Sequence, residues 1–211
     1  SSITRHDIVN QLMALEGNLT LLDKGQFDDY SIDHIQKVGS AAKRISSMIQ
    51  FTKEYEDIGV KAPIWHKARE LIENASKGIA LGPIKLTNDI PADLEVYADP
   101  LITKVFHNLI GNAVRHGGKI TSIRFYIEEH DGAHNIICED DGIGISSEIK
   151  DKLFTRNQGK DHGFGLFLSQ EILLITGIVI NEDGGPGKGA RFKIIVPAGA
   201  WHSRRLNAIV K

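Results

Sequence analysis

Four short motifs in this sequence carry residue types that bind nucleotides and transfer phosphoryl groups. They supply an imidazole, a pair of side-chain amides, a carboxylate in a glycine turn, and a glycine loop at the start of a helix. An imidazole nitrogen can act as a nucleophile, amide oxygens suit Mg²⁺, and backbone N–H groups at a helix start bind phosphate. Together they predict ATP binding and phosphoryl transfer to a side chain of the protein itself. In chain order the motifs are Arg5-His6-Asp7-Ile8-Val9-Asn10, Asn108-Leu109-Ile110-Gly111-Asn112, Asp140-Asp141-Gly142-Ile143-Gly144 and His162-Gly163-Phe164-Gly165-Leu166.

The candidate nucleophile, His6, lies on a helix predicted over residues 3–24. Apolar residues three and four apart form a seam on this helix, and His6 falls almost opposite the seam. We expect Asp7 to hold the proton of the second ring nitrogen, and Asn10, one turn on, to position water or a phosphoryl oxygen. The chain has 9 His residues, and most surface histidines do no chemistry, so this interpretation depends on the nucleotide motifs downstream.

The paired amides, Asn108 and Asn112, are four residues apart on a predicted helix and therefore share one face. Their oxygens, together with nucleotide phosphates and water, would complete the octahedral shell of Mg²⁺. Arg115 and His116 follow at the end of the helix, where their charges could reach phosphates. The apolar neighbours of the pair indicate a half-buried helix, which argues against two merely solvated asparagines.

The two glycine motifs are predicted to hold the rest of the nucleotide. A buried strand runs into the acidic turn, where a carboxylate could accept a hydrogen bond from an adenine amino group, and Gly142 and Gly144 would let the base lie against the backbone. The alternative is an acidic surface turn that binds no ligand. Gly163 and Gly165 precede an apolar helix whose first N–H groups could bind phosphate. The polar residues 145–162 predict a lid, in which Lys160 could meet the terminal phosphates.

The elements that position these motifs form two predicted domains, residues 1–59 and 60–211. Glycine and proline at residues 58–63 mark a linker between them. Helices are expected at 3–24, 31–57, 65–78, 100–116 and 164–176, and strands at 84–88, 94–97, 120–128, 134–139, 177–182 and 190–196, with Asp131-Gly132 as a hairpin turn. The first two helices would pair as a hairpin and dimerise into a four-helix bundle, with packing of a single hairpin on the remaining chain as the alternative. The irregular mixture beyond the linker predicts an α+β sandwich, so that the whole chain falls in the α+β class.

The composition is that of a globular protein and excludes several classes. The chain has 211 residues, 41% of them hydrophobic and 25% charged, which allows one or two domains with their own cores. A net charge of −2 gives no basic face for nucleic acid. Cys138 is the only cysteine, which excludes a disulfide framework and is expected to be a buried strand residue. No apolar run reaches the length of a membrane span, so a cytoplasmic location is expected, with membrane attachment only through a segment upstream.

These motifs resemble those of sensor histidine kinases. The first helix is similar to their H-box, residues 108–116 to the N-box, Asp141 to Gly144 to the G1 box, Phe154 to the F-box phenylalanine, and Gly163, Phe164, Gly165 and Leu166 to the G2 box. Gly187-Lys188-Gly189-Ala190-Arg191-Phe192 is similar to the glycine hairpin that closes the family's domain. The resemblance implies a dimerising phosphoacceptor hairpin followed by an ATP-binding α/β sandwich of the Bergerat type, shared with gyrase, Hsp90 and MutL.

The resemblance also implies a role for each site residue. His6 would accept the γ-phosphoryl group of ATP, with Asp7 as its acid–base residue. Asn10 would position water for hydrolysis of the phosphoaspartate on the protein that receives the phosphoryl group. Asn108 and Asn112 would hold Mg²⁺, and Asp141 would bind adenine. The phosphoryl group would pass to an aspartate in the receiver domain of a response regulator, and residues 3–57 would form the homodimer. The alternatives are a kinase-like dimeric adaptor that binds a receiver domain, an ATP hydrolase of the same superfamily, and a serine kinase of the anti-sigma type.

Overall fold

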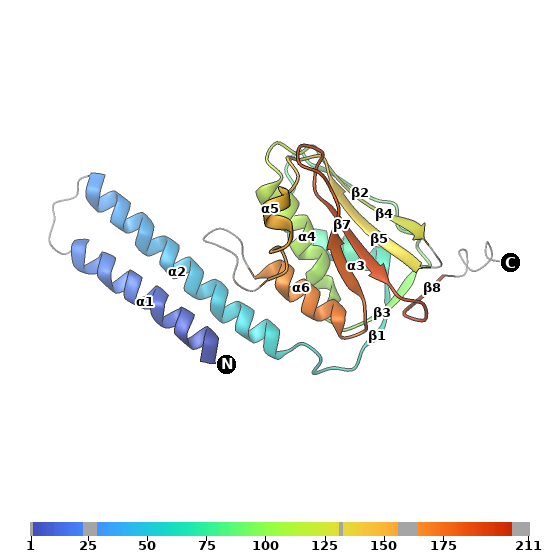
Figure 1. Ribbon diagram of the computed structural model, residues 1–211, viewed down its shortest axis with the longest axis horizontal. Helices are drawn as coiled ribbons and strands as arrows, with labels where there is room; N and C mark the ends of the chain where they lie inside the picture. The colour runs from blue at the N-terminus through green and yellow to red at the C-terminus, as the bar shows by residue number, and fades with distance from the viewer. Residues whose placement is uncertain (1, 23–28, 131–132, 156–163, 204–211) are drawn as a thin grey trace. The chain divides into compact units, whose positions relative to one another are not determined.

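The computed structural model describes residues 2–22, 29–130, 133–155 and 164–203 (Figure 1). The backbone alone is described for residues 2–7, 21–22, 29–31, 130 and 133. The chain forms two compact units, Ser1–Asp57 and Ile58–Lys211. None of the helices in the described ranges combines the length and the apolar character that crossing a bilayer requires.

The first unit is a hairpin of two helices, α1 (Ser2–Leu22) and α2 (Asp29–Glu56), which confirms the predicted helical hairpin. The more buried positions of each helix recur three or four residues apart, as a helix packed along one stripe requires. They include Ile8, Gln11, Leu15 and Asn18 on α1, and His34, Val38, Ala41, Ile45, Met48 and Phe51 on α2. One polar pair lies among them: His34 Nδ1 is 2.7 Å from Asn18 Oδ1.

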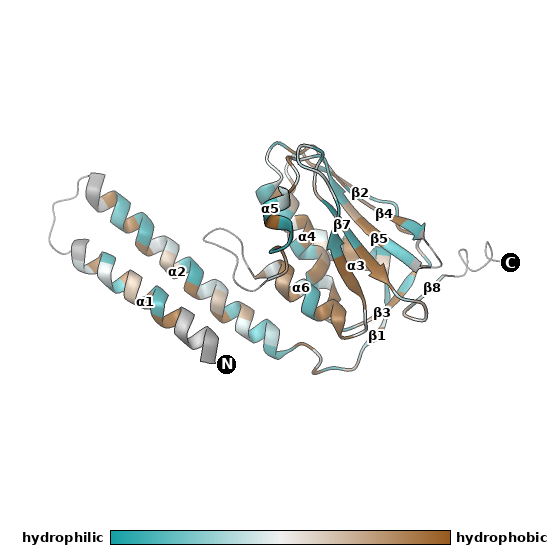
Figure 2. Ribbon diagram, in the orientation of Figure 1, coloured by the Kyte–Doolittle hydropathy of each residue, from teal (hydrophilic) through white to brown (hydrophobic). Residues whose placement is uncertain are grey.

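The predicted apolar seam does not face the partner helix along its whole length. Leu12 is 43% exposed, Leu19 48%, Ile35 48% and Ile49 56%. Each helix carries a wider apolar arc than a single neighbouring helix can cover, so part of the seam stays exposed within one hairpin. Figure 2 shows hydrophobic and hydrophilic residues interspersed along both α1 and α2.

The second unit consists of two sheets and a layer of helices. A five-stranded sheet has the order β2-β4-β5-β7-β6, and a small sheet has the order β1-β3-β8. Three helices, α3, α4 and α6, pack side by side over one face of the larger sheet (Figure 1). The bounds are β1 Ile64–Lys67, α3 Ala68–Ser76, β2 Lys85–Asn88, β3 Glu95–Ala98, α4 Ile102–His116, β4 Ser122–His130, β5 Ala133–Asp140, α5 Ser147–Lys150, α6 Gly165–Leu174, β6 Val179–Glu182, β7 Arg191–Val196 and β8 Trp201–His202. The α+β prediction is confirmed.

The core lies between the helix layer and the larger sheet. Alternate residues of the strands point into it, since successive strand side chains face opposite sides. Cys138 pairs in register with Phe125 and Phe192, and the Phe106 ring of α4 meets Phe125 edge-on at 6.0 Å between centroids. The buried residues of α4 are Ile102, Val105, Phe106, Leu109, Ile110, Gly111 and Ala113. This spacing leaves Asn108 and Asn112 together on the flank of the helix, beside its core-facing side.

Three short elements depart from the prediction. The helix expected from residue 65 begins at Ala68, because Ile64–Lys67 pair with β3 as an antiparallel strand. The stretch 145–162, predicted as a lid without secondary structure, contains the one-turn helix α5. Beyond residue 198, where no element was predicted, the short strand β8 pairs with the other edge of β3. β2 and β4 are parallel and α4 lies between them in the chain, so a crossover connects them, and β5 and β7 are likewise neighbours that do not follow each other in the chain. The Asp131-Gly132 turn lies outside the described residues, although its strands pair antiparallel as predicted.

A buried histidine at the end of the core makes the stability of this unit dependent on pH. His134 is 5% exposed and packs on Trp201, with 3.5 Å between ring centroids. Burial lowers its pKa, and the charge of Glu129 opposes this only in part. The unfolded chain therefore takes up a proton at higher pH than the folded one, near pH 6.5.

We expect the free energy of unfolding to decrease as pH falls below about 6.5, the ordinary histidine pKa, towards the lowered pKa of folded His134. The maximal loss is about 1.4 kcal/mol for each unit by which the folded pKa is lowered. His66, whose pKa is also lowered by burial, adds to the same trend. Urea denaturation between pH 5 and 7.5 measures the free energy of unfolding and its dependence on pH. His134→Phe should make the dependence shallower, and the same change at exposed His107 should not; equal slopes in all three proteins would contradict the assignment.

Candidate functional site

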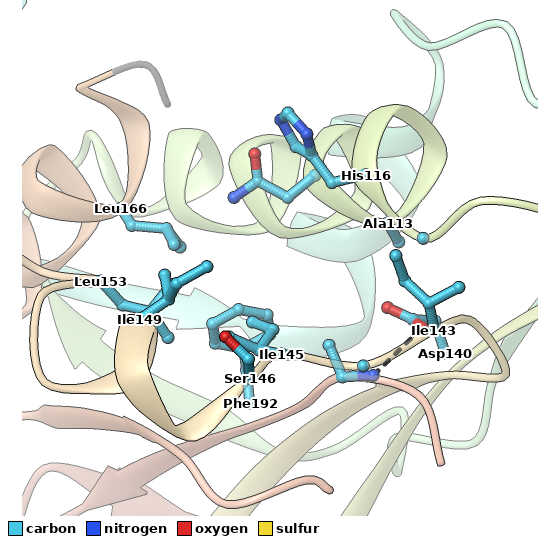
Figure 3. Close-up of a pocket in the computed structure, with 14 residues that line it drawn as sticks. Ala113, His116, Asp140, Ile143, Ile145, Ser146, Ile149, Leu153, Leu166 and Phe192 are labelled. Carbon is cyan, nitrogen blue, oxygen red and sulfur yellow. Dashed lines mark hydrogen bonds between the residues drawn. The ribbon is translucent and has the colours of Figure 1, made fainter. Parts of the chain in front are cut away.

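The described residues of the second unit enclose a pocket of about 300 Å³ between α4, the glycine turn after β5, α5, the start of α6, and β7 (Figure 3). Figure 3 shows Ile149, Leu153 and Leu166 at one end and Asp140 and Ile143 at the other. Most of the lining is apolar, with a few polar groups, as in sites that bind a flat small molecule. The lining residues are Asn112, Ala113, His116, Gly117, Asp140, Ile143, Gly144, Ile145, Ser146, Ile149, Leu153, Leu166, Ala190 and Phe192.

Two glycines of the turn shape the pocket because no side chain fits at their positions. A Cβ atom on Gly142 would lie 2.4 Å from the carbonyl oxygen of Gly117. Gly144 has a φ of +69°, and a Cβ there would lie 2.3 Å from the carbonyl oxygen of Gly185. The turn therefore packs directly against the end of α4 on one side and the β6–β7 connection on the other.

The carboxylate in the pocket is Asp140. Its side chain is 7% exposed, and Oδ1 accepts hydrogen bonds from the N–H groups of Gly142 (2.9 Å) and Ala190 (3.1 Å). Burial raises the pKa of Asp140, whereas these two hydrogen bonds lower it. Gly189 adds to the close packing here: it has a φ of +85°, and a Cβ on it would overlap the Asp140 carbonyl oxygen at 1.8 Å.

Asp141, the residue expected to bind adenine, points elsewhere. Its side chain is exposed and accepts hydrogen bonds from the Thr121 hydroxyl and from the N–H groups of Thr121 (2.8 Å) and Ser122 (3.0 Å). These bonds, the hydroxyl first, hold the pKa of Asp141 well below its ordinary value. Asp140 lines the pocket, whereas Asp141, the residue named for the adenine contact from the sequence, does not. The alternation of the strand contained the signal, since Asp140 lies two residues beyond the inward-facing Cys138.

The two asparagines of α4 are placed differently with respect to the pocket. Asn112 lines it, and its Oδ1 accepts a hydrogen bond from Arg115 Nη2 at 3.2 Å. Asn108 lies outside the lining, where its Nδ2 donates to the Gly165 carbonyl (2.9 Å) and to Ser169 Oγ (3.2 Å). Asn108 thus joins α4 to the start of α6.

The second glycine motif is described from Phe164 onwards. Gly165 begins α6, and a Cβ there would lie 3.1 Å from Cγ of Asn108, so a glycine lets the two helices approach. Leu166 lines the pocket, as predicted for this motif, and Phe164 directly precedes the helix. Phe154 is half-buried next to the lining residue Leu153, without itself lining the pocket. Lys160 and Gly163 lie outside the described residues.

Of the remaining predicted site residues, His6, Asp7 and Asn10 belong to α1 of the first unit, and Arg115 and His116 to the end of α4. His6 and Asp7 are part of α1, and their side chains lie outside the description. Asn10 is exposed on the same helix. In the second unit, His116 lines the pocket, whereas Arg115 is not among the lining residues and donates a hydrogen bond to the lining residue Asn112.

Sequence reasoning missed the apolar wall of the pocket. Ile149 and Leu153 come from the short α5 and the turn after it, and Phe192 points inward from β7. The four-residue spacing of Ile149 and Leu153 indicates a shared helical face and could have identified them. Phe192 could have been found by alternation along its strand, because its neighbours Arg191 and Lys193 are both polar.

Residues 98–200, the part that contains this pocket, match the family of histidine kinase-, DNA gyrase B-, and HSP90-like ATPases. Curated sensor histidine kinases are among the relatives of the chain. The sensor histidine kinase YvrG of Bacillus subtilis (strain 168) is 26% identical over 192 residues, which cover 80% of this chain and 33% of YvrG. This stretch of the second unit is similar to the ATPase domains of that family, which bind ATP. Its mixed sandwich has the Bergerat-type α/β fold expected from the motifs.

Solved structures show the same fold over more of the chain. Histidine kinase AdeS of Acinetobacter baumannii aligns with a TM-score of 0.63 and 20% identity, covering 92% of this chain and 98% of that one. Histidine kinase ThkA, solved in complex with the response regulator protein TrrA, aligns with a TM-score of 0.67 and 20% identity, covering 93% of this chain and 60% of that one. The chain spans between a third and a half of the length of the first curated relatives that it matches.

Proposed function

We propose that this protein is a histidine kinase that phosphorylates itself on His6 with ATP and passes the phosphoryl group to an aspartate of a response regulator. One observation carries the proposal: an apolar pocket with a buried carboxylate lies inside the part of the chain that matches the ATPase family. The domains then have distinct roles. Residues 1–59 supply the phosphoacceptor and the dimer contact, and residues 60–211 bind the nucleotide.

The adenine base is assigned to the pocket. A volume of about 300 Å³ is at the lower end of the range for small-molecule sites, which fits a base better than a whole nucleotide. Oδ1 of Asp140 accepts the two backbone N–H groups, and we assign Oδ2 to the adenine amino group. Gly142 and Gly144 bring the backbone close to the base, and Ile149 and Phe192 contribute the apolar wall.

The phosphates and Mg²⁺ are assigned to the flank of α4 and the start of α6. Oδ1 of Asn108 and Oδ1 of Asn112 are hard oxygen ligands on one side of α4. The N–H groups at the start of α6, beginning with Gly165, face a phosphate as a helix N-terminus does. When bound, Mg²⁺ would neutralise charge on the phosphates. The predicted nucleotide-binding set also includes Arg115, His116, Phe154, Lys160, Gly163 and Phe164.

On the first helix, His6 is the proposed phosphoacceptor. Asp7 would hold the proton of the second ring nitrogen, so that the nitrogen facing ATP keeps its lone pair. Asn10, exposed one turn further along α1, would position a water against a phosphorylated receiver domain. That role would give the protein phosphatase activity towards its regulator. ThkA has been solved with a response regulator, and we propose a partner of the same kind here.

A homodimer through residues 3–57 is part of the proposal. Leu12 and Leu19 on α1 and Ile35 and Ile49 on α2 are exposed in the single hairpin. A second hairpin would cover them and complete a four-helix bundle. Sedimentation that shows only monomer at high micromolar concentration would contradict the dimer without affecting the nucleotide site.

The kinase proposal is tested by incubating the protein with γ-labelled ATP. We expect label to enter the chain in a form that is lost in acid and stable in alkali, as phosphohistidine is, and to require Mg²⁺. Addition of a cognate receiver domain should move the label to that domain. A protein that binds ATP in calorimetry yet acquires no label under any of these conditions would contradict the kinase assignment.

A further inference from the structure

A buried ion pair lies beside the nucleotide pocket, outside the residues that line it. Lys150 is the last residue of α5, and its Nζ lies 2.7 Å from Oε2 of Glu182, the last residue of β6. The side chain of Glu182 is 1% exposed and that of Lys150 is 23% exposed. A carboxylate buried to this degree stays charged only where its partners replace the lost water.

The partners of Glu182 come from three segments of the chain. Its Oε1 accepts the N–H groups of Gly184 (3.0 Å) and Arg191 (3.2 Å), while Oε2 faces Lys150. Lys150 also donates to the Gly184 carbonyl oxygen. One carboxylate therefore connects α5, the turn after β6 and the first residue of β7.

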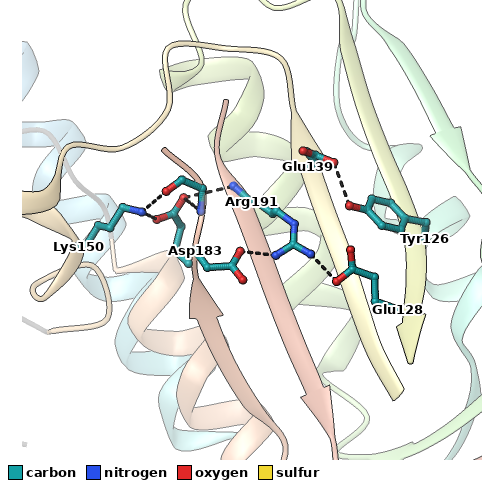
Figure 4. A network of polar contacts seen from close by, with 8 residues as sticks. Tyr126, Glu128, Glu139, Lys150, Asp183 and Arg191 are labelled. Atoms are coloured by element: carbon teal, nitrogen blue, oxygen red, sulfur yellow. Dashed lines mark hydrogen bonds and ion pairs between the residues drawn. The ribbon is translucent and has the colours of Figure 1, made fainter. Parts of the chain in front are cut away.

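The β7 end of this connection is itself held in place. Figure 4 shows the Arg191 guanidinium between Asp183 and Glu128. The two ion pairs each measure 2.5 Å, and Glu128 belongs to β4, across the sheet. The β7 end is thus braced against its own sheet, whereas α5 is a helix of 4 residues with no buried residue of its own. A helix this short is not stable without external contacts.

The connected segments form two walls of the pocket. Ile149 and Leu153, on either side of Lys150 in sequence, line one wall, and Ala190 and Phe192, on either side of Arg191, line the other. Lys150 itself directs its ammonium group to Glu182 and Gly184 instead of the pocket. Any effect of Lys150 on a ligand must therefore pass through the position of its neighbours.

We propose that Lys150 is a positioning residue for nucleotide binding, which holds α5 through buried Glu182 so that Ile149 and Leu153 close the apolar wall around the base. The inference rests on the proposed nucleotide site. It assigns Lys150 to the adenine end of the ligand, in contrast to a lysine that contacts phosphate. The two roles differ in which part of the nucleotide loses affinity when the lysine is removed.

The test compares adenosine, ADP and ATP binding to the whole chain and to Lys150→Met, by displacement of a fluorescent nucleotide. We expect all three dissociation constants to rise by the same factor, about tenfold. A phosphate contact would instead weaken ADP and ATP and leave adenosine unchanged. Lys67→Met is the matched control, because Lys67 pairs with Glu70 at 2.9 Å on the exposed surface, and it should leave all three constants unchanged.

Coupling to Glu182 separates positioning from a general loss of stability. Lys150→Arg, which keeps the charge, should restore most of the affinity. Glu182→Gln should weaken adenosine binding, and adding it to Lys150→Met should cost no more than the larger single effect. Thermal unfolding is followed for every variant. If Lys150→Met does not fold, Lys150→Met/Glu182→Met, which leaves no buried charge unpaired, takes its place, with the same tenfold loss for adenosine expected.

Unchanged adenosine affinity in folded Lys150→Met, or in the double variant Lys150→Met/Glu182→Met that replaces it, would overturn the inference, as would a loss confined to ADP and ATP. A wild-type chain that binds none of the three ligands would instead contradict the proposed function.

Discussion

Asp140→Asn is expected to weaken ATP binding about a hundredfold, because hydrogen bonds to a charged group contribute about 1.5–3 kcal/mol. The asparagine keeps the size of the aspartate but loses the charge that makes Oδ2 a strong acceptor for an amino group. The side chain is 7% exposed, so water does not replace the lost interaction well. Calorimetry with ATP and ADP measures the change, and both ligands should lose affinity equally, since they share the base.

Asp141→Asn is the matched control, with the same chemical change one residue further along the chain. Asp141 is exposed and bonds Thr121 and Ser122 at the start of β4. Its replacement should leave ATP affinity within about twofold, since surface changes away from a site have small effects. A lower melting temperature is the expected cost. A hundredfold loss in Asp141→Asn with normal binding in Asp140→Asn would restore the original assignment to Asp141.

His6→Gln is expected to abolish incorporation of label from γ-labelled ATP, to below about 1% of wild type, since a glutamine amide is not a nucleophile. ATP affinity should be unchanged, because the pocket is built entirely from residues of the second unit. The assay is acid-labile label after a fixed incubation, together with calorimetric ATP binding by the same protein.

His107→Gln is the control for the histidine change, because His107 is an exposed residue of α4 that does not line the pocket. It should incorporate label at the wild-type rate. Acid-labile label that persists in His6→Gln at the wild-type level would move the phosphoacceptor to another histidine. Loss of label in both variants would indicate that the histidine changes act through the fold.

The elements that depend on local pattern were predictable from the sequence. Apolar residues three and four apart indicated α1, α2 and α4, and alternating or continuous apolar runs indicated most of the strands of the larger sheet. These patterns need only one side of each element to face a core. Residue types and glycine spacing also marked Asn112, Gly144 and Leu166 as candidate nucleotide-binding residues, and these three line the pocket.

The short elements were not predictable in this way. β1 has 4 residues, α5 has 4 and β8 has 2, too few for a periodic pattern to show. β1 and β8 are strands because β3 lies between them and pairs with both, although β3 and β8 are far apart in the chain. Pairing between distant segments follows from tertiary packing, which local propensity does not encode.

The choice between Asp140 and Asp141 depends on both the sequence and the tertiary structure. Residue types and glycine spacing, read along the chain, predict that one carboxylate of this turn binds a base. Which one faces the pocket follows from the register of β5 against β7, where Ala190, 50 residues away, donates its N–H to Asp140. Likewise, Lys150 reads as an ordinary surface lysine until folding brings it to Glu182 and Gly184, the latter 34 residues away. The sequence determines which chemical groups are present. The direction in which a side chain points, and its burial, are decided only when distant segments pack together and exclude water.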